Sequence, residues 1–86
     1  MIAGIAWYRR DEYALLRALA SDADSMAATY EEWLVGATKL LADLQKQGLT
    51  ARRVDVELRE LAAWCEREGR ALDSAARSEF ATQKIR

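Results

Sequence analysis

Two pairs of adjacent arginines are the residues best suited to bind a ligand. A planar guanidinium group can hold two oxygen atoms of a phosphate or carboxylate at the same time. Trp7 and Tyr8 directly precede the first pair, and aromatic rings next to arginines stack on nucleic-acid bases. These pairs could form an anion-binding or nucleic-acid-binding cluster, while the competing interpretation pairs each arginine with a nearby surface carboxylate. The four candidate anion-binding residues are Arg9, Arg10, Arg52 and Arg53.

The residue types that catalysis or metal binding would require form no consistent pattern. Cys65 lies on an apolar helical stripe, and the chain has no His to act as its base, so we expect a small buried side chain. Asp22 and Asp24 have the opening spacing of a calcium loop, but Ala27 and Trp33 stand where that loop needs Gly and Glu. The other carboxylates alternate with basic residues at helical spacing, which is typical of solvated faces. We therefore expect no enzyme, no cofactor and no metal site.

The composition limits the classes of protein to which the chain can belong. Its 86 residues suffice for one small domain, and 13 basic residues nearly balance 14 acidic ones. This balance differs from the strongly basic composition of nucleic-acid-coating proteins, so nucleic-acid binding would need a local patch. A single Cys cannot form an internal disulfide, which favours a reducing compartment. The longest apolar stretch is far shorter than the ~20 residues that span a bilayer, so we expect a cytoplasmic protein without membrane contact.

The hydrophobic pattern predicts an α+β fold in a single domain over residues 1–86. The predicted elements are a strand at 2–8, a helix from Glu12 capped by Asp11, a helix capped by Thr29, a strand at 50–56, a helix at 57–68 and a helix capped by Asp73. Gly48 and Gly69 are expected to end the second and third helices. The apolar stripe of the second helix comprises Tyr30, Trp33, Leu34, Ala37, Leu40, Leu41 and Leu44.

The predicted order is β-α-α-β-α-α, about four helices with a two-stranded β element. Two helices between the strands reverse the chain twice, so an antiparallel pair is the simpler arrangement. Antiparallel strands would bring the two arginine pairs together, whereas parallel strands would place them at opposite ends. A helix is the alternative for residues 2–8, because Ile5, Tyr8, Leu15 and Leu19 could share one stripe. A longer helix capped by Thr50 is the alternative for the second strand, and an all-α bundle is the alternative fold.

The segments 5–10 (IAWYRR), 29–34 (TYEEWL), 54–65 (VDVELRELAAWC) and 73–80 (DSAARSEF) resemble a group of small uncharacterised bacterial proteins. The resemblance covers most of the chain. It implies a bacterial origin and supports a strand at residues 54–56, and it implies no activity, ligand or catalytic residue.

The sequence favours a non-enzymatic protein-interaction module that associates with itself as a dimer. A two-stranded sheet has two open edges, and a chain this small has a modest core, so a second copy or another protein would cover what the helices leave exposed. Aromatic residues are enriched at interfaces, and the candidate interface residues are Trp7, Tyr8 and Trp64. The alternative function is anion or nucleic-acid binding through the arginine cluster, with nucleic acid the less favoured partner.

Overall fold

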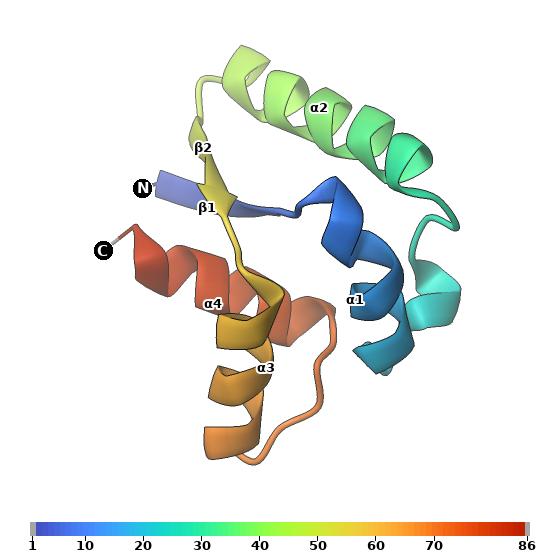
Figure 1. The fold of residues 1–86 in the computed structure, drawn as a ribbon. Helices are drawn as coiled ribbons and strands as arrows, with labels where there is room; N and C mark the ends of the chain where they lie inside the picture. The colour runs from blue at the N-terminus through green and yellow to red at the C-terminus, as the bar shows by residue number, and fades with distance from the viewer. Residues whose placement is uncertain (1, 86) are drawn as a thin grey trace.

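The computed structural model describes residues 2–85 and has the predicted α+β architecture (Figure 1). Its elements are β1 (Ile2–Trp7), a 3₁₀ turn η1 (Arg10–Glu12), α1 (Tyr13–Leu19), a 3₁₀ turn η2 (Ala23–Ser25), α2 (Tyr30–Lys46), β2 (Thr50–Asp55), α3 (Leu58–Arg67) and α4 (Ser74–Lys84). The order β-α-α-β-α-α is confirmed. The all-α bundle, the helix at residues 2–8 and the longer helix capped by Thr50 are all wrong. Within residues 2–85, no helix is long and apolar enough to cross a membrane.

The two strands run parallel, so the antiparallel prediction is wrong. The register pairs Ile2 with Thr50 at one end and Trp7 with Asp55 at the other. The error comes from counting α1 as a reversal along the sheet. α1 has only 7 residues, about 10 Å of helix, and it lies beyond the end of β1. α2 has 17 residues, about 26 Å, and alone carries the chain back to the start of the sheet.

The sheet lies between α2 on one face and α4 on the other, and α3 packs against α4 (Figure 1). Alternate residues of β1 face α4, as the close approach of Gly4 to Ala81 shows. The other residues of β1 face α2, where the Trp7 ring contacts Trp33 with centroids 5.3 Å apart. The main core lies on the α4 side and includes Leu61, which is fully buried.

Local capping chemistry sets most of the helix ends as predicted. The Thr29 hydroxyl oxygen accepts a hydrogen bond from the Glu32 N–H at 3.2 Å, and the Asp73 carboxylate accepts one from the Ala76 N–H at 2.9 Å. Gly48 follows α2 with a positive φ of 82°, a conformation that glycine adopts without strain.

The predicted start of the first helix is wrong. A 3₁₀ turn occupies residues 10–12, and α1 begins at Tyr13 with Glu12, rather than Asp11, in the N-cap position. The Glu12 carboxylate accepts a hydrogen bond from the Leu58 N–H at 3.3 Å, at the start of α3. This acidic side chain therefore ties the first turn of α3 to the segment that leaves β1.

The apolar stripe of α2 is less buried than its spacing predicts. Ala37 is the only buried residue along this helix, and Leu40 on the predicted stripe is 49% exposed. Two strands spaced about 4.8 Å apart form a sheet no wider than the ~10 Å diameter of a helix. So narrow a sheet cannot cover a broad apolar stripe, and part of the α2 surface stays open.

Candidate functional site

The parallel pairing separates the two arginine pairs. Arg52 lies opposite Gly4 within the sheet, whereas Arg9 follows the far end of β1. Five residues of extended chain between the levels of Gly4 and Arg9 correspond to about 16 Å. The arginine cluster depended on antiparallel strands, which would bring the two pairs together. Because the strands are parallel, the pairs do not meet.

Three of these arginines have local partners instead. Arg9 lies 3.8 Å from the Asp11 carboxylate. Arg10 forms an ion pair with Glu31 and lies over the Tyr30 ring, 4.6 Å from its centroid. In β2, the Arg53 guanidinium lies 5.2 Å from the centroid of the Trp7 ring. These contacts agree with the interpretation that the arginines are separate surface residues.

The structure places the candidate interface aromatics in different environments. Tyr8 and Trp64 are only 8% and 7% exposed and belong to the core. The Trp64 ring packs on Phe80 with centroids 5.5 Å apart. Trp7 is partly exposed, between Trp33 and the Arg53 guanidinium. Burial therefore leaves Tyr8 and Trp64 little surface for a partner, and Trp7 alone keeps some.

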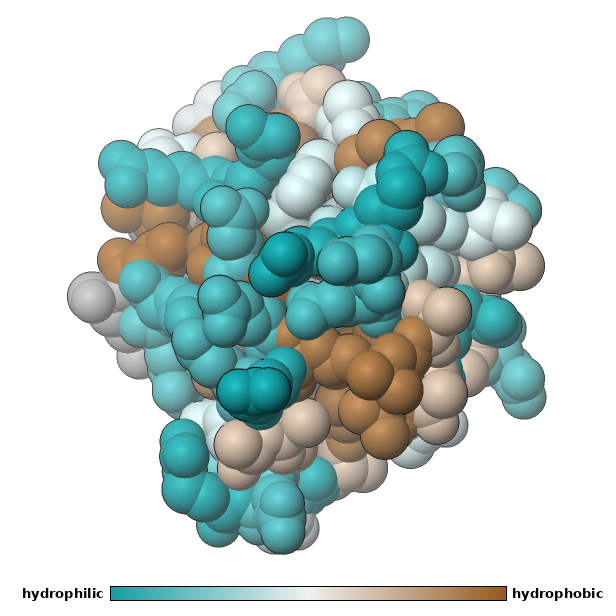
Figure 2. Space-filling model, viewed as in Figure 1, coloured by the Kyte–Doolittle hydropathy of each residue, from teal (hydrophilic) through white to brown (hydrophobic). Residues whose placement is uncertain are grey.

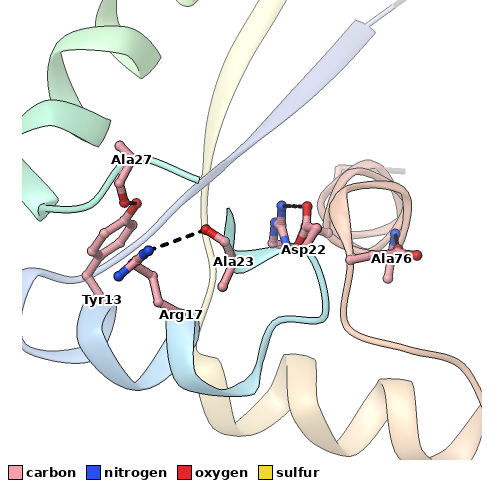
Figure 3. A network of polar contacts seen from close by, with 8 residues as sticks. Tyr13, Arg17, Asp22, Ala23, Ala27 and Ala76 are labelled. Atoms are coloured by element: carbon pink, nitrogen blue, oxygen red, sulfur yellow. Dashed lines mark hydrogen bonds and ion pairs between the residues drawn. The ribbon is translucent and has the colours of Figure 1, made fainter. Parts of the chain in front are cut away.

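A salt bridge that the sequence analysis did not find joins the η2 turn to α4. The Arg77 guanidinium donates two hydrogen bonds to the Asp22 carboxylate, both at 2.8 Å (Figure 3). The Arg77 and Asp22 side chains are only 11% and 23% exposed. The hydrogen bonds from Arg77 hold the pKa of Asp22 below its ordinary value. Next to this pair, burial raises the pKa of Tyr8 to about 12.

A second set of polar contacts fixes the connection between α1 and α2. The Tyr13 hydroxyl donates to the Ala27 carbonyl at 2.6 Å, and Arg17 donates to the Ala23 carbonyl at 3.4 Å (Figure 3). Arg17 and Tyr13 project from the same side of α1. These bonds hold the turn η2 and the segment after it against α1, and so position the start of α2.

A groove of about 440 Å³ runs along the outer edge of β1. Its floor is the β1 segment from Ala3 to Ala6. Trp33, Leu40 and Leu44 of α2 line one wall, Ser74, Arg77 and Ser78 of α4 line the other, and residues 25–27 close one end. The groove thus combines an apolar wall, a hydroxyl-bearing wall and a strand edge.

The backbone of β1 presents unpaired polar groups to this groove. The Val56 N–H donates to the Trp7 carbonyl at 3.0 Å, so Trp7 and, by alternation, Ile5 direct their N–H and C=O groups toward β2. Gly4 and Ala6 consequently direct theirs away from β2. In the described part of the chain, none of the hydrogen bonds outside the helices and the sheet ladder involves Gly4 or Ala6.

Apolar side chains also reach the surface away from the groove. Figure 2 shows them in several places among charged residues, on the face turned to the viewer. The large exposed side chains include Leu15 and Leu19, four residues apart on α1, which are 56% and 49% exposed. Val35 on α2 is the most exposed of these residues, at 71%.

Within residues 2–85, no group of three or more His, Cys, Asp or Glu side chains could hold a metal ion. Cys65 is buried, as predicted, and burial raises the pKa of its thiol. Comparisons with protein families, curated proteins and solved structures find no match for this chain.

Proposed function

We propose that this chain is a non-enzymatic protein-interaction module and that the outer edge of β1 is its contact surface. The observation that carries the proposal is that this edge is unprotected. Natural sheet edges are usually blocked by charged side chains, proline or a bulge, because an open edge pairs with other chains. The β1 segment Ile2–Trp7 contains no charged residue and no proline, and its register with β2 is continuous, without a bulge.

The outer edge of β2 supports the proposal by contrast. The residues of β2 that alternate outward include Arg53 and Asp55, which are charged and exposed. The Gln45 side chain donates a hydrogen bond to the outward carbonyl of Ala51 at 3.4 Å. The outer edge of β2 thus carries charged side chains and a side-chain hydrogen bond, whereas the outer edge of β1 faces a groove.

The alternative function, anion or nucleic-acid binding through the four arginines, has lost its geometric support. Arg9 and Arg10 each lie beside a carboxylate, Arg53 lies against the Trp7 ring, and Arg52 lies about 16 Å along the strands from Arg9. We therefore favour a protein partner over a polyanion.

We also propose that the module forms a homodimer in the bacterial cytoplasm. Exposed Leu15 and Leu19 of α1 and Val35 of α2, which lie outside the groove, support self-association, and the resemblance to small bacterial proteins and the single Cys support the compartment. Sedimentation velocity at micromolar concentration, at low and at moderate salt, tests it. If apolar contacts hold the dimer together, it should persist at both salt concentrations. A monomer at both concentrations would contradict self-association.

Selection of random peptides displayed on phage tests the interaction function itself. Leu40→Glu and Val35→Glu form a matched pair, because both residues are exposed and apolar on α2 but only Leu40 lines the groove. We expect peptides enriched on the wild-type protein to lose binding to the Leu40→Glu variant and to keep binding to the Val35→Glu variant. No enrichment, or equal loss with both variants, would contradict the assignment of this surface.

A further inference from the structure

We infer that the groove binds an extended segment of another protein, in which apolar and acidic residues alternate, as an added strand on β1. This inference rests on the proposed function and names the chemistry of the partner. Gly4 and Ala6 present N–H and C=O groups in the spacing that an extended backbone matches. An added strand would satisfy these groups and lie about 4.8 Å from β1, inside the groove.

The two walls determine which side chains the segment carries. Successive side chains of a strand point to opposite faces of the sheet. On the α2 face, a side chain of the segment meets Leu40, Leu44 and Ile5, so an apolar residue fits there. On the α4 face, a side chain meets the hydroxyls of Ser74 and Ser78 and the guanidinium of Arg77.

The hydrogen-bond donors of the α4 wall favour acceptor side chains, carboxylates among them, at the second set of positions. Arg77 is the one charged residue among those described as lining the groove. Its two hydrogen bonds to Asp22 use one N–H on each Nη atom, so that further N–H groups remain on the guanidinium. A carboxylate or hydroxyl on the segment can accept from these N–H groups, whereas a lysine ammonium has no acceptor to offer them.

A second copy of this chain does not fit as the occupant. α4 packs directly over β1, because a Cβ on Gly4 would lie 3.0 Å from the Ala81 carbonyl oxygen. Two copies paired through β1 would place their α4 helices over strands about 4.8 Å apart, whereas packed helices need about 8–10 Å between axes. A single extended segment carries no such helix, so the proposed homodimer uses another surface.

Three capped hexapeptides titrated into the ¹⁵N-labelled protein test the inference. The first alternates Val and Glu, the second alternates Val and Lys, and the third repeats the first with N-methyl groups on all of its Val and Glu amides, so that either direction of an added strand is tested. We expect the Val/Glu peptide to shift the Gly4 and Ala6 amide signals and to slow their hydrogen exchange. The Val/Lys and N-methylated peptides should each bind about tenfold more weakly, because each loses charge-assisted or backbone hydrogen bonds.

Proline substitutions test the same edge from the side of the protein. Ala6→Pro removes an outward N–H without removing a bond of the β1–β2 ladder, and Arg53→Pro does the same on the outer edge of β2. We expect only Ala6→Pro to abolish Val/Glu peptide binding. If Ala6→Pro does not fold, the comparison of the N-methylated and unmodified peptides still tests whether a strand is added to β1.

Two results would overturn the inference. Equal binding of the N-methylated and unmodified peptides would show that no strand is added. Binding without changes at the Gly4 and Ala6 amides would place the peptide elsewhere. Phage peptides that depend on Leu40 but show no alternation would overturn this inference and leave the proposed function standing, whereas an absence of enriched peptides would remove both.

Discussion

The salt bridge between Asp22 and Arg77 predicts a large loss of stability when Asp22 is changed to Asn. The amide keeps the shape of the carboxylate but loses its charge and replaces one acceptor by a donor that faces the guanidinium. Exposed ion pairs contribute about 0.2–1 kcal/mol, and breaking a buried pair costs about 3–5 kcal/mol. With side chains 11% and 23% exposed, this pair lies between these limits, so we expect a loss of about 2–3 kcal/mol.

Urea unfolding followed by tryptophan fluorescence, together with thermal unfolding followed by circular dichroism, measures this loss. For a domain of this size, about 2–3 kcal/mol corresponds to a fall in Tm of roughly 10–20 °C. Asp43→Asn is the matched control, because Asp43 pairs with Lys39 at 3.0 Å but the two side chains are 44% and 76% exposed. We expect the control to change stability by no more than about 0.5 kcal/mol. Equal effects of the two substitutions would refute the structural role of the Asp22–Arg77 pair.

The effect of Asp22→Asn also depends on pH in a defined direction. The folded-state pKa of Asp22 is lowered by hydrogen bonds from Arg77, so its contribution to stability is complete above the unfolded pKa of about 3.9. The contribution is lost as the pH falls from there through the lower folded pKa. The difference in unfolding free energy between wild type and variant should therefore be constant near neutral pH and shrink below about pH 4. A difference that stays constant into acid would contradict a charged pair.

Three further predictions concern the interior. Leu61→Ala should lower the unfolding free energy by about 2–5 kcal/mol in urea, because Leu61 is fully buried. Gly4→Ala should lower it by about 1–3 kcal/mol, since the new methyl group would lie 3.0 Å from the Ala81 carbonyl oxygen, and an unchanged midpoint would contradict this close approach. Cys65 should react with iodoacetamide only as fast as the chain unfolds, because burial raises the pKa of its thiol, and immediate labelling of the folded protein would contradict the assigned burial.

The parts of the fold that the sequence predicts correctly depend on contacts between near neighbours. Thr29 and Asp73 cap helices whose N–H groups lie three residues further on, and Gly48 ends a helix through its own backbone conformation. Such interactions need no knowledge of the rest of the chain. The two strands were also predicted within one residue of their ends, since apolar alternation is itself local.

The features that the sequence does not predict join distant segments. Asp22 and Arg77 are 55 residues apart, and neither has a neighbour that marks it as part of a pair. The strand direction depends on the path of α1, whose seven residues leave the sheet instead of running back along it. The groove needs α2, α4 and β1 together, so no single stretch of sequence contains it.

One difference visible in the sequence does separate the two sheet edges. β2 carries Arg52, Arg53 and Asp55, whereas β1 carries no charge. An uncharged strand indicates burial on both sides when a sheet has many strands. In a sheet of only two parallel strands, neither strand can be central, and the same uncharged segment becomes an open edge.

The packing of α4 then limits which partner this edge admits. Gly4 lets the helix backbone lie close above β1, and this contact joins the two ends of the chain in one core. The same closeness leaves no space for a second α4 over a neighbouring strand. We infer that the residue that lets α4 pack so closely on β1 also disfavours a symmetric sheet between copies, so that the edge fits a partner that contributes only an extended segment.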